Sequence, residues 1–335
     1  MLFRSRFAAM SVLPGLFLAV SIALTVSFVS ANLGGPAMLY ALLFGMIFNF
    51  LITDERLRPG IRMASRNVLR LGVALLGVRI TTTEVGDLGW PVGILVISAV
   101  SATIFVGWGL GRLCGLRNSH AMLSSCAVAI CGASAALAVA SVLPWHKDHD
   151  RNTALTVVGV TALSTLAMIF YPVFVTYLKL PNTTAGVFLG ATIHDVAQVV
   201  GAGYMISDTT GETSTLVKLM RVACLVPVIL LITLVLRTKR SESKRREPLL
   251  PWFLVVFVIL VAINSLAWIP NQVRDVLHAA SSFCLLTGVA ALGVSTSLKS
   301  MVEVGPAPIG AMLLQTAFLA VFVLGSLYLF FPAQL

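Results

Sequence analysis

The stretch from Gly186 to Met205 reads GVFLGATIHDVAQVVGAGYM. It is long and apolar enough to cross a bilayer, yet its centre holds an acidic residue, Asp195. A carboxylate at that depth costs about 2.5 to 3.5 kcal/mol to insert, so it faces a protein interior or a water-filled cavity rather than lipid. An ionisable group kept there is typical of proteins that move a solute or a proton, and it therefore indicates transport.

The composition of the whole chain is that of an all-α polytopic membrane protein. The 335 residues have a mean hydropathy of +0.97 and are 58% hydrophobic and 11% charged, whereas soluble domains are about 25% charged. Apolar spans of about 20 residues fit eleven times between charge clusters and Pro or Gly breaks. They are Val12 to Val29, Pro36 to Ile52, Ala64 to Thr82, Pro91 to Gly111, His120 to Leu143, Thr153 to Val175, Ala185 to Met205, Thr213 to Leu236, Pro251 to Ala267, Arg274 to Leu298 and Pro306 to Phe331.

The net charge of +10 follows membrane orientation, and no nucleic-acid partner is expected. If the N-terminus is cytoplasmic, 17 of the 23 Lys and Arg residues fall on the cytoplasmic side. They are Arg4, Arg6, Arg56, Arg58, Arg62, Arg66, Arg70, Arg112, Arg117, Lys179, Lys299 and the six from Arg237 to Arg246. The C-terminus, Leu335, is then expected outside. Arg79, at the end of the third span, is expected to snorkel towards water.

Several other classes lack their required residues, and no enzyme activity, cofactor or metal is expected. An intramembrane aspartyl protease needs two membrane carboxylates, and only Asp195 qualifies. The zinc motif His-Glu-x-x-His and the phosphate-binding loop Gly-x-x-x-x-Gly-Lys-Ser/Thr are both missing from the sequence. The five cysteines show no paired spacing. Cleavage of the first span as a signal peptide is left open by Val29-Ser30-Ala31, which fits a cleavage site.

The ten spans after the first divide into two sets of five. An extra N-terminal helix (1–31) would precede a first repeat (32–180) and a second repeat (181–335), and an odd number of spans makes the second run inverted through the membrane. A different relationship, between Gly72 to Val78 and the nearly identical Gly288 to Val294, is equally open.

The division pairs the fifth span with the tenth, and both are rich in small residues at the centre. Half-helices restarting near Ser134 and Gly288 would direct unpaired N–H groups into a midplane cavity, where they favour an anion. The alternative is that these small residues only allow close helix packing. The predicted substrate-binding residues are Cys131, Gly132, Ala133, Ser134, Thr287 and Gly288.

Three stretches resemble the YeiH-like sulfate exporter family of bacterial inner-membrane proteins. They are Gly190 to Val200, with its His-Asp-Val-Ala-Gln segment, Cys131 to Ala136, and Val217 to Val222. The resemblance covers nearly the whole chain and implies the inverted-repeat fold of the cation:proton antiporter and anion transporter superfamily, with two crossing broken helices. The chain departs from the family pattern at Asp195, where glutamate is more usual.

Asp195 is expected to exchange a proton or to release a cationic partner when the anion binds. By depth in the spans, its partner is Arg221 or Lys218. The alternative is a fixed, structural ion pair. His194, which titrates near neutral pH, is either a second coupling group or a packing residue. Two further polar residues complete the predicted coupling set: Gln198 in the same segment, and Asn49, which the repeat pairs with Asp195.

Together these features predict a secondary transporter that exports a small inorganic anion, sulfate or a related sulfur oxyanion, across the bacterial inner membrane. A cation:proton antiporter on the same fold and a passive anion channel are the alternatives. Coupling to protons or a counter-ion, and assembly as a homodimer, are left open by the sequence.

Overall fold

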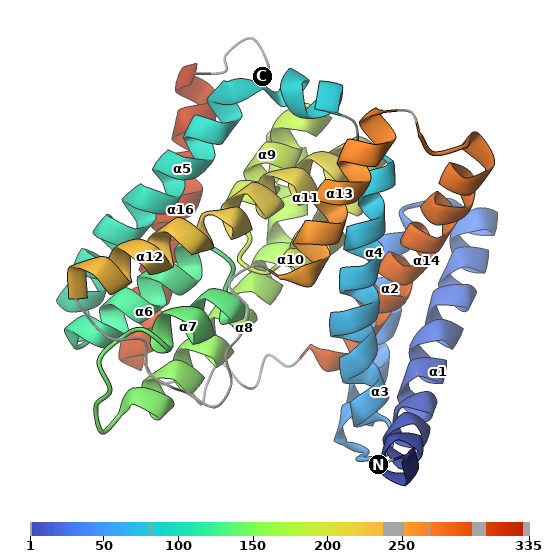
Figure 1. Cartoon of the computed structure of the whole chain (residues 1–335), viewed down its shortest axis with the longest axis horizontal. Coiled ribbons are helices and arrows are strands. Elements are labelled where there is room, and N and C mark those ends of the chain that lie inside the picture. The colour runs from blue at the N-terminus through green and yellow to red at the C-terminus, as the bar shows by residue number, and fades with distance from the viewer. Residues whose placement is uncertain (1, 81, 237–250, 267, 297–305, 331–335) are drawn as a thin grey trace. The chain divides into compact units, whose positions relative to one another are not determined.

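The computed structural model describes residues 2–80, 82–236, 251–266, 268–296 and 306–330, and every regular element in them is helical (Figure 1). The all-α prediction is therefore confirmed. Several residues used to predict the membrane orientation lie outside what is described. They are the Arg237 to Arg246 loop, Lys299, Leu335 and the side chains of Arg4 and Arg6.

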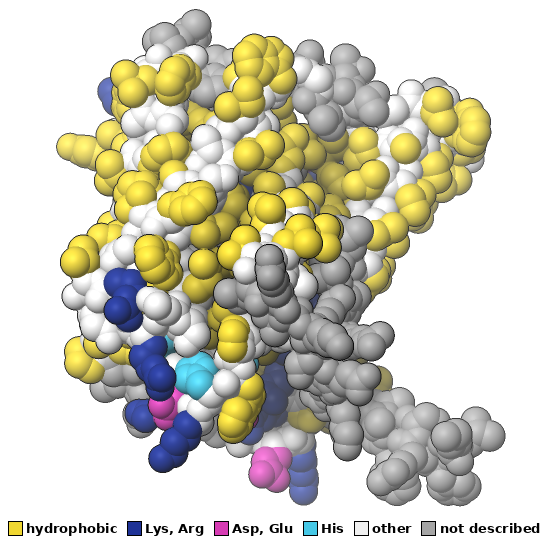
Figure 2. Space-filling view, turned by 60° about the vertical axis from the view of Figure 1, so that its left-hand side comes forward, with side chains coloured by type: hydrophobic (Ala, Val, Ile, Leu, Met, Phe, Trp, Pro, Cys, Tyr) yellow, Lys and Arg dark blue, Asp and Glu magenta, His cyan; other side chains and the backbone are white. Residues whose placement is uncertain are grey.

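Six helical segments in the described residues are long and apolar enough to cross a membrane, which confirms a multi-pass membrane protein. They are Val12–Leu33, Leu88–Leu113, His149–Tyr177, Asp208–Val235, Asn271–Ser295 and Pro306–Phe330. Large apolar side chains on them are exposed, among them Phe17, Phe105 and Leu234. Figure 2 shows hydrophobic side chains over most of the visible face and charged ones gathered towards its lower end, the pattern of a lipid-facing surface with one polar rim.

The remaining predicted spans fall on helices that are shorter or interrupted. The second is α2 (Ala37–Ile47) and η1 (Phe48–Thr53), and the third is α3 (Arg58–Met63), η2 (Ala64–Val68), α4 (Leu69–Leu75) and η3 (Leu76–Val78). The fifth divides into α6 (Asn118–Ala129) and α7 (Ala133–Ala140), and the seventh into α9 (Asn182–Thr192) and α10 (Val196–Tyr204).

The chain forms two compact units. The first comprises 1–87, 200–212 and 252–297. Within it, α14 (Asn271–Ser295) packs against α2 and α4, α1 (Leu2–Leu33) packs against α2 and α3, and α13 (Trp252–Ser265) covers α4. The second unit comprises 88–199, 213–251 and 298–335. It contains both interruptions, with α6, α7, α9 and the start of α10. It also contains most of α5 (Thr82–Leu113), α8 (His149–Tyr177), most of α11 (Asp208–Ala223), α12 (Leu225–Leu236) and α16 (Pro306–Phe330).

The first interrupted helix is a hairpin. Arg117, just before α6, lies 3.9 Å from the carboxylate of Asp148, which follows α7. Ser119 Oγ lies 3.5 Å from His146 Nε2 in the same place. The segment therefore begins and ends at one level, and α6, with 12 residues, reaches only about 18 Å. The interruption near Ser134 is confirmed, but the prediction that the fifth span crosses the membrane is wrong, because its centre turns back.

The second interrupted helix also returns to the level at which it starts. Gly190 of α9 packs against Ser214 of α11, and one turn further along both helices Lys218 donates to the carbonyl of Ile193. A later residue of α11 therefore contacts a later residue of the α9 segment, which means that the two helices run parallel. The chain between them, α10 and its following turn, must therefore lead back to the starting level of α9. The seventh span is thus a second hairpin rather than a full crossing.

Candidate functional site

The two interruptions lie together at the centre of the second unit. The first covers Ile130 to Gly132, where Gly132 has φ 64° and ψ −124°, a conformation that L side chains rarely adopt. The second covers Ile193 to Asp195, where Ile193 is extended with φ −65° and ψ 140°. Each interruption leaves the last carbonyl groups of one half-helix without intrahelical donors.

Arg221 of α11 satisfies these carbonyls. Its Nε donates to Ala129 O at 3.0 Å, and its NH2 donates to Val128 O at 2.9 Å and to Ala129 O at 2.7 Å. Its NH1 donates to Ile193 O at 3.1 Å and to Gly190 O at 3.4 Å. The guanidinium therefore joins the carboxyl ends of α6 and α9, and it is fully buried while doing so.

Lys218, one turn earlier on α11, joins the same two ends. Its Nζ donates to Ile130 O and to Ile193 O, both at 2.8 Å, and the side chain is fully buried. A helix carboxyl end carries a partial negative charge of about half an elementary charge. Two such ends partly compensate the two cations. An ammonium group has three N–H donors, so the third remains for a ligand or water.

The predicted ion pair of Asp195 with Arg221 or Lys218 is wrong. No carboxylate in the described part of the chain lies within 4.0 Å of either cation. Asp195 instead caps α10, because its Oδ1 accepts the N–H of Ala197 at 2.9 Å, while its own N–H donates to Ser164 Oγ at 3.0 Å. The half-buried carboxylate remains within electrostatic range of Lys218.

His194 is fully buried. Its Nδ1 lies 3.1 Å from Val128 O, and its Nε2 lies 3.0 Å from Thr316 Oγ1 of α16. A carbonyl only accepts, so Nδ1 carries a proton. The Thr316 hydroxyl lies within reach of both Nε2 and Met312 O, the latter at 2.8 Å, and it can donate its one proton to only one of them. These contacts favour the packing interpretation over a role as coupling group.

Gln198 presents an unused acceptor. Its Nε2 donates to Thr165 Oγ1 at 2.9 Å, and Thr165 in turn donates to the carbonyl of Thr161. Among the described residues no donor reaches Gln198 Oε1, although the side chain is 1% exposed. Residues three apart share a helix face, so this oxygen and the carboxylate of Asp195 lie on the same side of the first turn of α10.

The start of α7 presents donors. No side chain caps it, and the first intrahelical bond is from Ala136 N to Gly132 O, so the N–H groups of Ala133 and Ser134 have no intrahelical acceptor. Both residues are half-buried, whereas the preceding Cys131 is buried. The predicted residues 131–134 therefore lie at an interruption, next to the carbonyl that Lys218 binds.

Comparison with known proteins gives one consistent result. The family model described as Conserved hypothetical protein 698 matches residues 14–312. The chain belongs to this family. It is 48% identical over 316 residues to the UPF0324 membrane protein CT0845 of Chlorobaculum tepidum, with 93% of this chain and 88% of the relative covered. It is 46% identical over 314 residues to the UPF0324 membrane protein TauZ of Paracoccus denitrificans, with 92% and 93% covered. No solved structure matches the chain.

In this UPF0324 family member, the three other predicted site residues belong to the first unit. Gly288 lies inside the continuous helix α14, so the predicted restart there is wrong. A Cβ at this position would overlap Leu69 of α4, which means that the glycine allows close helix packing. Thr287 is buried beside it. Asn49 donates to Val294 O at 2.8 Å and to Thr296 O at 2.7 Å, and so caps the end of α14.

Sequence reasoning missed the hydroxyl groups that position the second interruption. Ser164 and Thr165 of α8 bind Asp195 and Gln198, and Thr316 of α16 binds His194. All three are at most 7% exposed. In the sequence, these residues are marked only by a hydroxyl group within an apolar helix. Most such hydroxyls donate to the backbone carbonyl four residues earlier, so the pattern does not indicate a site.

Proposed function

We propose that this protein is a secondary transporter of a small inorganic anion, sulfate or a related sulfur oxyanion. The observation that carries the proposal is the start of α7, which no side chain caps, beside two buried cations. Within the described ranges, neither cation has a carboxylate partner. Helix N-termini and an ammonium donor together favour an oxyanion. The resemblance to the YeiH-like sulfate exporters supports the choice of anion and an inner-membrane location.

The two hairpins fall in the fifth and seventh predicted spans, which the five-plus-five repeat does not pair, and the tenth span is the continuous helix α14. The hairpins therefore do not support that repeat. In the proposed fold, each half of the chain after the first helix contributes one hairpin, α6 and α7 in the first half, α9 and α10 in the second. The first hairpin would enter from the cytoplasm and the second from outside. Many secondary transporters bind their substrates where interrupted helices meet near the midplane.

Asp195 is the proposed coupling group. It caps α10 through one carboxylate oxygen, so the other can change protonation without uncapping the helix. A cation:proton antiporter is the second candidate, because the unused Gln198 Oε1 and the Asp195 carboxylate together offer a cation two acceptors.

The hairpins predict a topology that differs from eleven full crossings. Two half-crossings preserve the parity of the chain, so the N-terminus stays cytoplasmic and the C-terminus outside. However, Lys147 becomes cytoplasmic and Lys179 periplasmic, the reverse of the eleven-span arrangement. We expect an impermeant maleimide added to intact cells to label Lys179→Cys and not Lys147→Cys. Arg56→Cys is the cytoplasmic control. Labelling of Lys147→Cys and not of Lys179→Cys would instead support the topology with eleven full crossings.

Counterflow in proteoliposomes tests the function itself. We expect labelled sulfate, sulfite or thiosulfate to accumulate against the same unlabelled anion inside, with a saturable rate, because a carrier exchanges its substrate. Flux that follows only the electrochemical gradient would instead indicate a channel. Exchange of Na⁺ or K⁺ for protons without anion flux would support the antiporter.

Substitution at the start of α7 tests the anion site. Ser134→Ala removes one hydrogen-bonding group, so the Kd of the transported anion should rise about 2- to 10-fold, equivalent to about 0.5 to 1.5 kcal/mol. Ser141→Ala, at the residue that follows the other end of α7, is the matched control, because its hydroxyl donates to Ala138 O at 2.7 Å. Equal affinity in both variants, measured by isothermal titration, would place the anion away from α7.

A further inference from the structure

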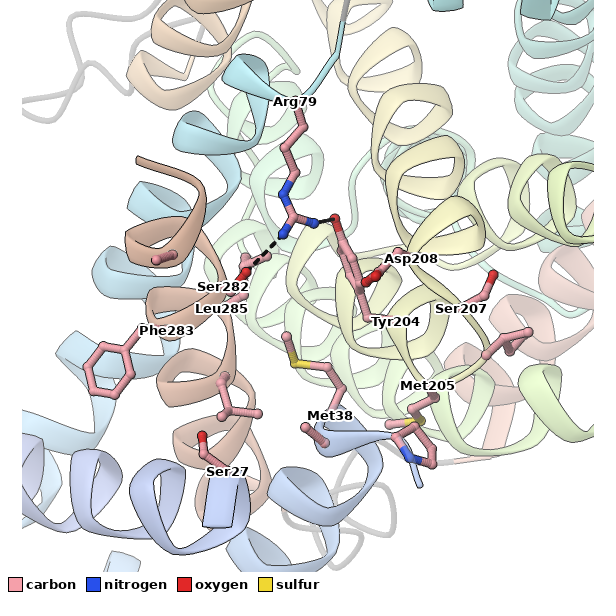
Figure 3. A pocket seen from close by; sticks show the side chains of 15 residues that line it. Ser27, Met38, Arg79, Tyr204, Met205, Ser207, Asp208, Ser282, Phe283 and Leu285 are labelled. Carbon is pink, nitrogen blue, oxygen red and sulfur yellow. Dashed lines mark hydrogen bonds between the residues drawn. The ribbon is translucent and has the colours of Figure 1, made fainter. Parts of the chain in front are cut away.

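The first unit contains a cavity of about 740 Å³ that the proposed anion site does not use. It is lined by α14, the starts of α2 and α11, and the side chain of Arg79 (Figure 3). Much of its wall is apolar, with Met38, Leu285 and Leu286 among its residues. Its volume falls in the range of about 300 to 1,000 Å³ that is usual for sites of organic ligands. A bare inorganic oxyanion would leave most of this space and its apolar wall unfilled.

Arg79 brings a positive charge to this cavity. Its side chain is 9% exposed, so the expected snorkelling towards water is wrong. NH2 donates to Ser282 Oγ at 3.0 Å and lies 3.1 Å from His278 Nδ1. NH1 reaches Tyr204 OH only at 3.5 Å and Glu212 Oε1 only at 3.3 Å.

These distances leave the charge loosely paired. Charge-assisted N–H···O bonds are ordinarily about 2.7 to 2.9 Å long, so the bond to Glu212 is well outside the usual length. In addition, Arg79 Nε is buried without a partner among the described residues. Figure 3 shows the guanidinium between the hydroxyls of Tyr204 and Ser282, above Met38.

We propose that this cavity binds a soluble organic anion with a short apolar body. Its oxyanion takes the place of the long contacts that Arg79 NH1 now makes to Tyr204 OH and Glu212 Oε1, and it accepts charge-assisted hydrogen bonds from the planar guanidinium. The hydroxyls of Tyr204 and Ser282 flank the oxyanion. The apolar body contacts Met38 and Leu286. This binding goes beyond the proposed transport and does not depend on it.

Asp208 distinguishes a simple anion from a zwitterion. It also lines the cavity, at the start of α11, and is exposed, so solvent screens its charge. For a monoanion its residual effect is repulsive, and Asp208→Asn should tighten binding. For a zwitterion, Asp208 would hold the ammonium group, and the same substitution should weaken binding.

Titration of hexanoate into the protein in phosphatidylcholine nanodiscs tests the proposal. We expect saturable binding to the wild type that Arg79→Gln weakens about ten-fold or more, the range for hydrogen bonds to a charged group. Arg70→Gln is the matched control in the same unit, where Arg70 stacks on the ring of Phe253 at 5.6 Å and does not line the cavity. It should bind hexanoate as the wild type does.

A second variant keeps the test decisive if Arg79→Gln does not fold. Ala279→Phe fills the cavity from α14 and leaves the guanidinium in place, so it should abolish hexanoate binding while thermal melting stays close to that of the wild type. Undiminished binding to either folded variant would overturn the proposal. So would tighter binding of hexylammonium than of hexanoate, displacement of hexanoate by phosphatidylglycerol in the disc, or weaker binding to Asp208→Asn.

Discussion

Arg221→Leu is expected to lower the free energy of unfolding by about 2 to 6 kcal/mol, the cost of two buried acceptors left without a donor. The substitution removes the five hydrogen bonds that Arg221 now donates. The carbonyls of Ala129 and Gly190 then lack a side-chain donor, whereas Val128 O keeps His194 and Ile193 O keeps Lys218. Each unsatisfied buried acceptor costs about 1 to 3 kcal/mol, and losses above about 4 kcal/mol are confined to such disruptions. Thermal melting of the purified variant, compared with the wild type, measures the effect.

Two variants bracket this result. Arg221→Lys keeps the charge with three donors in place of five, so its loss should be intermediate. Arg112→Leu removes an exposed arginine whose NH1 makes one bond, to Leu116 O at 2.8 Å, and should change stability by less than about 1 kcal/mol. If Arg221→Leu melts like Arg112→Leu, the two half-helix ends do not depend on the guanidinium.

Asp195→Asn is expected to abolish or uncouple transport while the protein stays folded. Asparagine caps a helix about as well as aspartate, so the bond from Ala197 N to the side chain at 195 can persist. What disappears is the negative charge beside Lys218 and the capacity to exchange a proton. In proteoliposomes, the wild-type rate should respond to an imposed pH gradient, and the variant should show no flux or a flux that ignores the gradient.

Two control variants distinguish the loss of the Asp195 charge from the loss of the helix cap and from the loss of a carboxylate elsewhere. Asp195→Ala removes the cap as well and should lose about 1 kcal/mol of stability. Asp275→Asn removes a carboxylate from the exposed face of α14 and should transport normally. An Asp195→Asn variant with wild-type rate and pH response would show that this carboxylate is not the coupling group.

The interruption at Gly132 could be predicted because its signal is local. A glycine among small residues weakens a helix by about 1 kcal/mol relative to alanine, and here it also adopts a positive φ. The same signal at Gly288 was misleading, since a glycine serves equally well where two helices pack closely. Local propensity is identical in the two cases, and only the neighbouring Leu69 distinguishes them.

The sequence by itself determined the helical class, the multi-pass membrane character and the polar groups of the interrupted segments, because these follow from hydrophobicity and charge along the chain. Only the tertiary structure decided that two of the segments are hairpins and that Arg221 and Lys218 bind carbonyls rather than Asp195. The acceptor of Arg221 Nε lies 92 residues away, at Ala129. It is a backbone group, and since every residue carries one, no pattern in the sequence marks which carbonyl a buried cation will meet.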